Sequence, residues 1–165
     1  MPLTLRESAH LISDPEHLKF SVLEVFETML GVACESLRPG AEEARIGSAE
    51  SVTAVVGFGG ILSGACVITC DESSARQIAS RLTGMEFETL DDVVKDAIGE
   101  ICNMVAGAWK SRVPELAANC GLSVPAVITG RDYNLHMHSP EFKVTHLYGF
   151  DGAQFQAAIV CDQLL

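Results

Sequence analysis

The sequence lacks the features that would mark a nucleic-acid-binding or membrane protein. Its 22 acidic residues outnumber its 11 basic ones, and no cluster of lysine and arginine occurs that could follow a phosphate backbone. No apolar run is long enough to cross a bilayer, and residues 1–7 contain no apolar signal core. We therefore expect a cytoplasmic protein that binds neither membranes nor nucleic acid, with a protein or a cation as its partner.

Paired cysteine motifs are also missing. The six cysteines form no Cys-x-x-Cys pair and most have aliphatic neighbours, so we interpret them as reduced residues of the core. A redox-sensitive thiol among them is the alternative that the sequence leaves open. The six are Cys34, Cys66, Cys70, Cys102, Cys120 and Cys161.

Metal-binding and phosphate-binding motifs are sparse. The pair His136-x-His138 would place two imidazoles on one face of a strand, which is half of a metal site, but no third ligand accompanies it. The glycines within 57–60 are not followed at once by a helix, so they indicate a turn rather than a phosphate-binding loop. We expect no metal site in this chain.

The pattern of apolar residues predicts an α/β (α+β) protein with a mainly antiparallel sheet, because the connections between its strands are too short for crossovers. Strands are predicted at 52–57 and 62–69, joined by a turn at Gly59-Gly60, and in the alternating tail from 142 to 150. Three helices are predicted from capping residues and apolar period. The first runs from Pro15 to about Glu35, and the second is capped by Asp71 and ended by Gly84. The third is opened by a capping box at 89–92 and continues to about Lys110 or Ser111.

The sequence contains an internal duplication. The segment 57–71 aligns with 149–162 with a single-residue gap, and each copy lies downstream of an amphipathic helical pattern. We expect one domain over 1–165, built from two related halves at about 15–84 and about 89–162. When the two helices are aligned, Glu27 stands opposite Glu100, but Leu30 stands opposite Asn103. Only the second helix keeps a polar pair, so we expect function on that helix.

The polar face of the second helix is narrow. At about 100° per residue, five residues fall within a stripe about 80° wide: Asp96, Glu100, Asn103, Gly107 and Lys110. An asparagine in a helix interior is less favourable than alanine by roughly 0.7 kcal/mol, which favours a functional reason for Asn103. The alternative is a merely solvated helix face, since Glu-x-x-Asn alone is a common pattern.

The segment Asp96-Ala97-Ile98-Gly99-Glu100-Ile101-Cys102-Asn103 resembles the signature of the CheC/CheX/FliY phosphatases of bacterial chemotaxis. That pattern is Asp or Ser, three residues, Glu, two residues, Asn, and a proline some two dozen residues later. Pro125 matches the proline, one residue earlier than the usual spacing. The segment 26–31 resembles the first helix of the CheX branch, which carries no active pair. The likeness runs from about His17 to Cys161 and includes the duplication.

This resemblance implies a pseudo-twofold fold, with an antiparallel sheet flanked by two long helices, and an enzyme of two-component signalling. The expected substrate is the aspartyl phosphate of a CheY-like receiver domain. Asn103 would orient the attacking water, and Glu100 would pair with the receiver's invariant lysine. Asp96, Gly107 and Pro125 would serve docking or belong to the motif, with Asp96 as a docking or helix-start residue.

The resemblance also bears on cofactors and partners. The chain would need no cofactor of its own, because the Mg²⁺ belongs to the receiver. A homodimer is expected because the CheX branch is dimeric, and the apolar stripe of the first helix fits either a buried face or a dimer contact. A second function stays open: a non-catalytic adaptor of the same fold that binds a receiver or another signalling protein.

Overall fold

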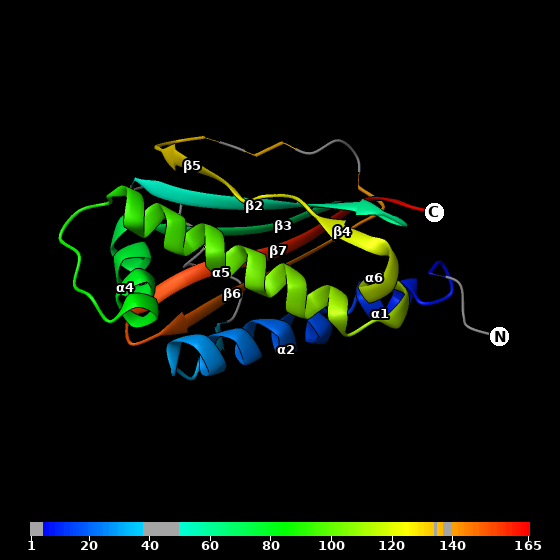
Figure 1. Ribbon diagram of the computed structural model, residues 1–165, viewed down its shortest axis with the longest axis horizontal. Coiled ribbons are helices and arrows are strands. Elements are labelled where there is room, and N and C mark those ends of the chain that lie inside the picture. Colours follow the sequence, from blue (N-terminus) through cyan, green and yellow to red (C-terminus); the bar gives the residue numbers. More distant parts are fainter. Residues whose placement is uncertain (1–4, 38–49, 134, 137–139) are drawn as a thin grey trace.

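The chain folds into one antiparallel sheet with its helices packed on one face, as Figure 1 shows. The computed structural model describes residues 5–37, 50–133, 135–136 and 140–165. Its strands are β1 (Glu35–Leu37), β2 (Ser51–Gly60), β3 (Leu62–Asp71), β4 (Cys120–Leu122), β5 (Ala126–Gly130), β6 (Phe142–Phe150) and β7 (Ala153–Leu164). Its helices are α1 (Ala9–Ile12), α2 (Pro15–Val25), the π-helical turn η1 (Phe26–Leu30), α4 (Glu72–Thr83), α5 (Asp92–Ser111) and α6 (Pro114–Asn119). The predicted mixed fold with an antiparallel sheet is confirmed.

The strand order is symmetrical about the central pair of strands. The order is β1-β6-β7-β3-β2-β4, and β5 also pairs with β2. Each hairpin therefore contributes one strand to the centre, and each short outer strand pairs with the hairpin from the other half of the chain. The boundaries of the proposed repeat stay a prediction, since the strand order does not locate them.

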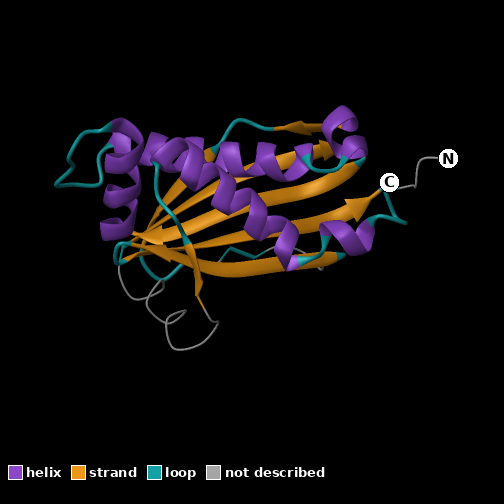
Figure 2. Ribbon diagram, turned by 90° about the horizontal axis from the view of Figure 1, so that it is seen from below, coloured by secondary structure: helices purple, strands orange, loops and turns teal. Residues whose placement is uncertain are grey.

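The long helix α5 packs on the face of the sheet that carries the helices (Figure 2), in contact with β2, β3, α2 and α4. Its inward face is fixed by the strands, because the Cys102 thiol donates to the carbonyl oxygens of Ala54 at 3.6 Å and Cys66 at 3.4 Å. Near its end, the ring of Trp109 packs against Phe58 with centroids 5.2 Å apart. Full burial of a large apolar side chain contributes roughly 1.5–3 kcal/mol, so this inward face fixes which residues of α5 turn outward.

The helix starts follow local capping chemistry. Asp14 accepts a hydrogen bond from the amide of Glu16 at 2.9 Å, and Asp71 accepts one from Ser74 at 2.7 Å, as their positions predict. The prediction that a capping box at Thr89 opens α5 is wrong. Asp91 is the N-cap instead: its backbone is extended, and its carboxylate accepts from the amide of Val94 at 3.0 Å.

The first long helix is shorter than its apolar period predicts. The pattern suggested a helix to about Glu35, but the α-helix ends at Val25 and the π-turn η1 ends at Leu30. Gly31 stops it because its φ of 66° is left-handed, a conformation that glycine adopts at little steric cost. The short elements α1, α6, β1, β4 and β5 were not predicted.

None of the helices in the described ranges is long and apolar enough to span a membrane.

Candidate functional site

The outward face of α5 presents the predicted polar residues. Asp96 and Glu100 are exposed, whereas Asn103 and Gly107 are half-buried. Their opposite face is buried against the sheet, through Val94, Ala97, Ile98, Ile101, Cys102, Val105, Ala106 and Trp109. A helix of 20 residues packed along this whole face is a rigid element, so it holds Glu100 and Asn103 at a fixed separation of one turn.

Glu100 and Asn103 have no partners of their own. Within the described ranges, neither side chain makes a hydrogen bond or an ion pair. The cations of α5 and of its C-cap are engaged elsewhere: Lys95 with Asp92 at 3.6 Å, Lys110 with the carbonyl of Cys120 at 2.6 Å, and Arg112 with Glu24 at 2.6 Å. A carboxylate and a carboxamide thus stand side by side with their bonding capacity available to another molecule.

Gly107 leaves empty space beside the pair. A Cβ built on Gly107 would meet nothing within 4 Å. Glycine in a helix interior is less favourable than alanine by about 0.8–1.0 kcal/mol, and packing against the described residues does not require a glycine at this position.

Pro125 packs against α5 beside the residue that precedes Glu100. A Cβ on Gly99 would lie 3.3 Å from the Cβ of Pro125 and 3.3 Å from a methyl of Val127. The structure thus brings Pro125 against the residue that precedes Glu100, despite its shifted spacing from the motif. Figure 1 shows the connection from β4 to β5 passing alongside the middle of α5. Gly99 and Val127 were not singled out from the sequence, although a glycine inside a helical pattern signals close approach of another segment.

Asp96 does not start the helix. Asp91 caps α5 and Asp92 occupies its first turn, so Asp96 stands in the second turn, one turn before Glu100. Asp96 has no partner among the described residues, and its exposed carboxylate extends the acidic face at Glu100. The helix-start role is therefore wrong, and the docking role stays a prediction.

The first long helix has no equivalent site. Glu27 is exposed, like Glu100, but Leu30 at the position of Asn103 is only 6 % exposed and belongs to the core of the chain. Of the two explanations for its apolar stripe, burial within the chain therefore accounts for Leu30.

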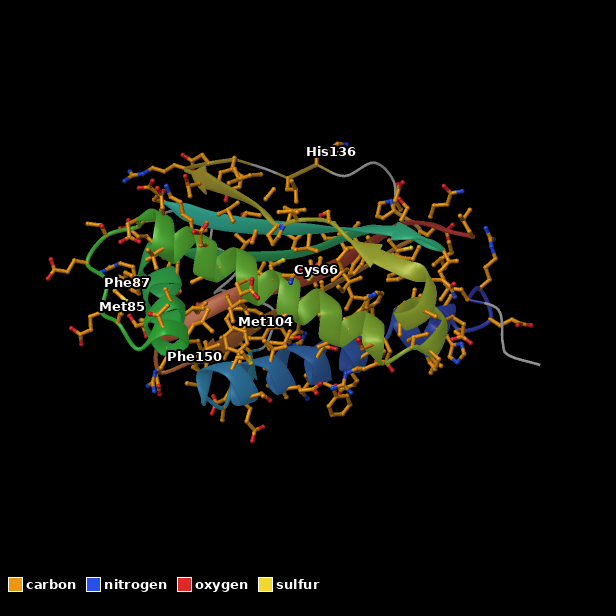
Figure 3. The ribbon with its side chains drawn as sticks, viewed as in Figure 1. Cys66, Met85, Phe87, Met104, His136 and Phe150 are labelled. Carbon is orange, nitrogen blue, oxygen red and sulfur yellow. The ribbon has the colours of Figure 1, made fainter. Side chains whose placement is uncertain are left out.

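Other candidates for chemistry lie apart from α5. His136 lines a hollow of about 450 Å³ on the sheet face away from the helices, and Figure 3 shows it on that side. His138 lies outside the described residues. In the described part of the chain, no group of three or more potential metal ligands comes together. The glycines at 57–60 lead into a turn, as predicted, with Gly60 at a φ of 111°.

The cysteines are free thiols, and burial favours the protonated form of three of them. Burial raises the pKa of Cys34 to about 12 and that of Cys161 to about 11. Burial also raises the pKa of Cys70. Because the thiolate is the reactive form, these thiols are inert at neutral pH, which weakens the alternative of a redox sensor.

Comparison with known proteins gives one consistent result. Residues 52–145, more than half of the chain, match the family model described as chemotaxis phosphatase CheX. The chain is 28% identical over 116 residues to the CheY-P phosphatase CheX of Thermotoga maritima, covering 70% of this chain and 74% of that protein.

Solved structures share the fold. A CheC-like superfamily protein from Shewanella sp. PV-4 superposes with a TM-score of 0.74 at 22% identity, over 90% of this chain and 96% of that one. CheX in the CheX–CheY–BeF₃–Mg²⁺ complex of Borrelia burgdorferi gives a TM-score of 0.66 at 22% identity, over 92% of this chain and 99% of that one.

Proposed function

This chain belongs to the CheX family of chemotaxis phosphatases, and from that premise we propose that it hydrolyses the aspartyl phosphate of a CheY-like receiver domain. The observation that carries the proposal is the unpartnered pair Glu100 and Asn103 on the outward face of α5. The names of the relatives support it, since the Thermotoga maritima protein is a CheY-P phosphatase and the Borrelia burgdorferi protein was solved with CheY.

The reaction needs positioning more than strong acid–base chemistry. An aspartyl phosphate is a reactive mixed anhydride, and a water oxygen attacks its phosphorus while the bond to the aspartate oxygen breaks. The products are the free carboxylate and inorganic phosphate; both protons of the attacking water end on the phosphate, which releases one to solvent as it becomes hydrogen phosphate. Holding the water in line with the breaking bond converts a random encounter into an oriented one, and such orientation accounts for much of the achievable rate.

Asn103 is suited to hold that water. Its amide oxygen accepts a hydrogen bond from water while its nitrogen donates, and the group carries no charge to repel the phosphoryl oxygens. Because Asn103 has no internal partner, no bond within the chain must break before it engages. Gly107 lets a partner approach the same face without meeting a side chain.

Glu100 is suited to fix the register of docking. Its exposed carboxylate is one turn from Asn103, and no cation of the described chain pairs with it. An ammonium group of the receiver beside its phosphorylation site would form a charge-assisted bond with this carboxylate. We assign docking roles to Asp96 and Pro125, which border the pair.

The same proposal covers cofactor, assembly and location. The Mg²⁺ is supplied by the receiver, so this chain brings no cofactor of its own. A homodimer and a cytoplasmic location complete the proposal, and light scattering on the purified chain tests the dimer. The alternative function, a non-catalytic adaptor, uses the same face for binding a receiver without changing its phosphate.

Phosphate release from phosphorylated receiver domains, with Mg²⁺, separates the two functions. We expect the wild type to accelerate release and Asn103→Ala to remove the acceleration while the variant still binds the receiver. Glu100→Ala should weaken binding. Glu27→Ala is the matched control, because Glu27 is the exposed counterpart on the first helix. If the wild type binds a receiver without shortening its phosphate lifetime, the adaptor function holds instead.

A further inference from the structure

The edge strand beside α5 contains a β-bulge. β2 pairs with β4 through Phe58 and Leu122, and with β5 through Val55 and Ala126. Between these pairs β2 has two residues, but the edge strand has three: Ser123, Val124 and Pro125. An extra residue in one strand leaves a position unpaired and re-aims its side chain, and such bulges are frequent at sheet edges and next to active sites.

The bulge is held firmly at both ends. The amide of Ser123 donates to the carbonyl of Gly57 at 2.9 Å, and the Ser123 hydroxyl accepts from the Gly57 amide at 2.8 Å. The same hydroxyl donates to the carbonyl of Val124 at 3.1 Å. On the other side, Pro125 packs on the inner face beside Gly99. Val124 therefore has an ordered backbone.

Val124 itself points into solvent. It is 86 % exposed, more than any other large apolar side chain in the described ranges. An apolar side chain on a pre-ordered backbone loses little conformational entropy on binding, and such preorganisation favours affinity. A flexible loop with the same exposed residue would lack this property.

We propose that Val124 is the apolar anchor of the docking surface for the receiver and sets the affinity for it. Asn103 positions the attacking water, and Glu100 fixes the register of docking. This inference rests on the proposed function. Val124 directly precedes Pro125, which packs beside Gly99, the residue before Glu100.

The position of Val124 in the chain brings it close to the proposed site. Consecutive Cα atoms are about 3.8 Å apart, so Val124 stands one step from the residue that touches Gly99, next to Glu100. A standard interface buries about 800 Å² on each partner, which is a disc about 16 Å in radius. A receiver that brings its phosphate to Asn103 therefore has Val124 within the radius of such an interface.

Steady-state phosphate release distinguishes this role from a catalytic one. We expect Val124→Ser to raise KM for the phosphorylated receiver about 5-fold or more at unchanged kcat, since truncated anchors lose more than about 1 kcal/mol. Val124→Ile keeps an apolar surface and should retain the wild-type KM. Leu11→Ser is the matched control: Leu11 is 51 % exposed, and α1 lies by the far end of α5 (Figure 1).

Each outcome has a defined meaning. An unchanged KM in Val124→Ser, beside a loss of turnover in Asn103→Ala, overturns the anchor and leaves the phosphatase standing. An unchanged turnover in Asn103→Ala overturns the phosphatase mechanism itself. If Val124→Ser changes the mass of the assembly measured by light scattering and leaves KM unchanged, Val124 belongs to a contact between copies of this chain, and the anchor role is refuted.

Discussion

Replacing Gly107 by alanine should stabilise the protein and impair its function. Gly107 is inside α5, and a Cβ there would meet nothing within 4 Å. The intrinsic preference of a helix interior for alanine is about 0.8–1.0 kcal/mol, so Gly107→Ala should raise the free energy of unfolding by about 1 kcal/mol. For a domain of this size, that corresponds to a rise in Tm of roughly 2–4 °C.

Gly99→Ala is the internal control for this argument. It has the same intrinsic gain on the same helix, but its Cβ would lie 3.3 Å from both Pro125 and Val127. Those neighbours must move, and overpacking typically costs about 1–3 kcal/mol. Gly99→Ala should therefore be less stable than Gly107→Ala, and urea unfolding of the two variants measures the difference directly.

The effect of Gly107→Ala on function should be opposite in sign to its effect on stability. The new methyl of Gly107→Ala would stand one turn beyond Asn103, on the face that the receiver is proposed to cover. We expect a higher KM for the phosphorylated receiver in the phosphate-release assay. A variant that is more stable and equally active would show that no partner uses this space. A variant that is less stable than the wild type would refute the steric reasoning itself.

Three further predictions concern the elements that hold the site. Asp91→Ala should lower the free energy of unfolding by about 1 kcal/mol through loss of the cap to Val94, whereas Thr89→Ala should change it by less than about 0.5 kcal/mol in the same urea titration. Leu30→Asn should lower the free energy of unfolding by about 2–5 kcal/mol, because it places an unpartnered amide in the core. Phosphate-release assays of this variant should show no second active site. A stable variant with doubled activity would contradict this prediction. The free energy of unfolding should fall as the pH rises from about 9 through 11 in reducing buffer. The reason is that the unfolded chain releases thiol protons from about pH 9, while the folded chain retains them on Cys34 and Cys161. In a series of urea titrations, the unfolding midpoint should fall less steeply with pH in Cys34→Ser than in the wild type.

Local signals account for the parts that were predicted correctly. The period of α5 and the caps at Asp14 and Asp71 depend on residues within one or two turns, and the structure has them where they were expected. The errors at helix ends are also local. At Thr89, a weaker capping pattern competed with Asp91, and at Gly31 a left-handed glycine outweighed the apolar period that continued beyond it.

The contact between Pro125 and Gly99 belongs to a different class of feature. It depends on the register of an edge strand on β2 and on one extra residue within that strand, neither of which has a signal in the spacing of the motif. The sequence showed both residues, but the strand register that brings them together becomes visible only in the fold.

The two halves differ in the length of helix beyond the equivalent position. Leu30 is the last residue of η1, directly before the left-handed Gly31, and Phe26 in the same turn stacks on Phe155 with centroids 4.4 Å apart. That turn therefore packs into the core together with its apolar stripe. Asn103, by contrast, is followed by two more turns of α5, whose buried face holds it at the surface. A sheet with symmetrical order can thus support a site on only one of its long helices.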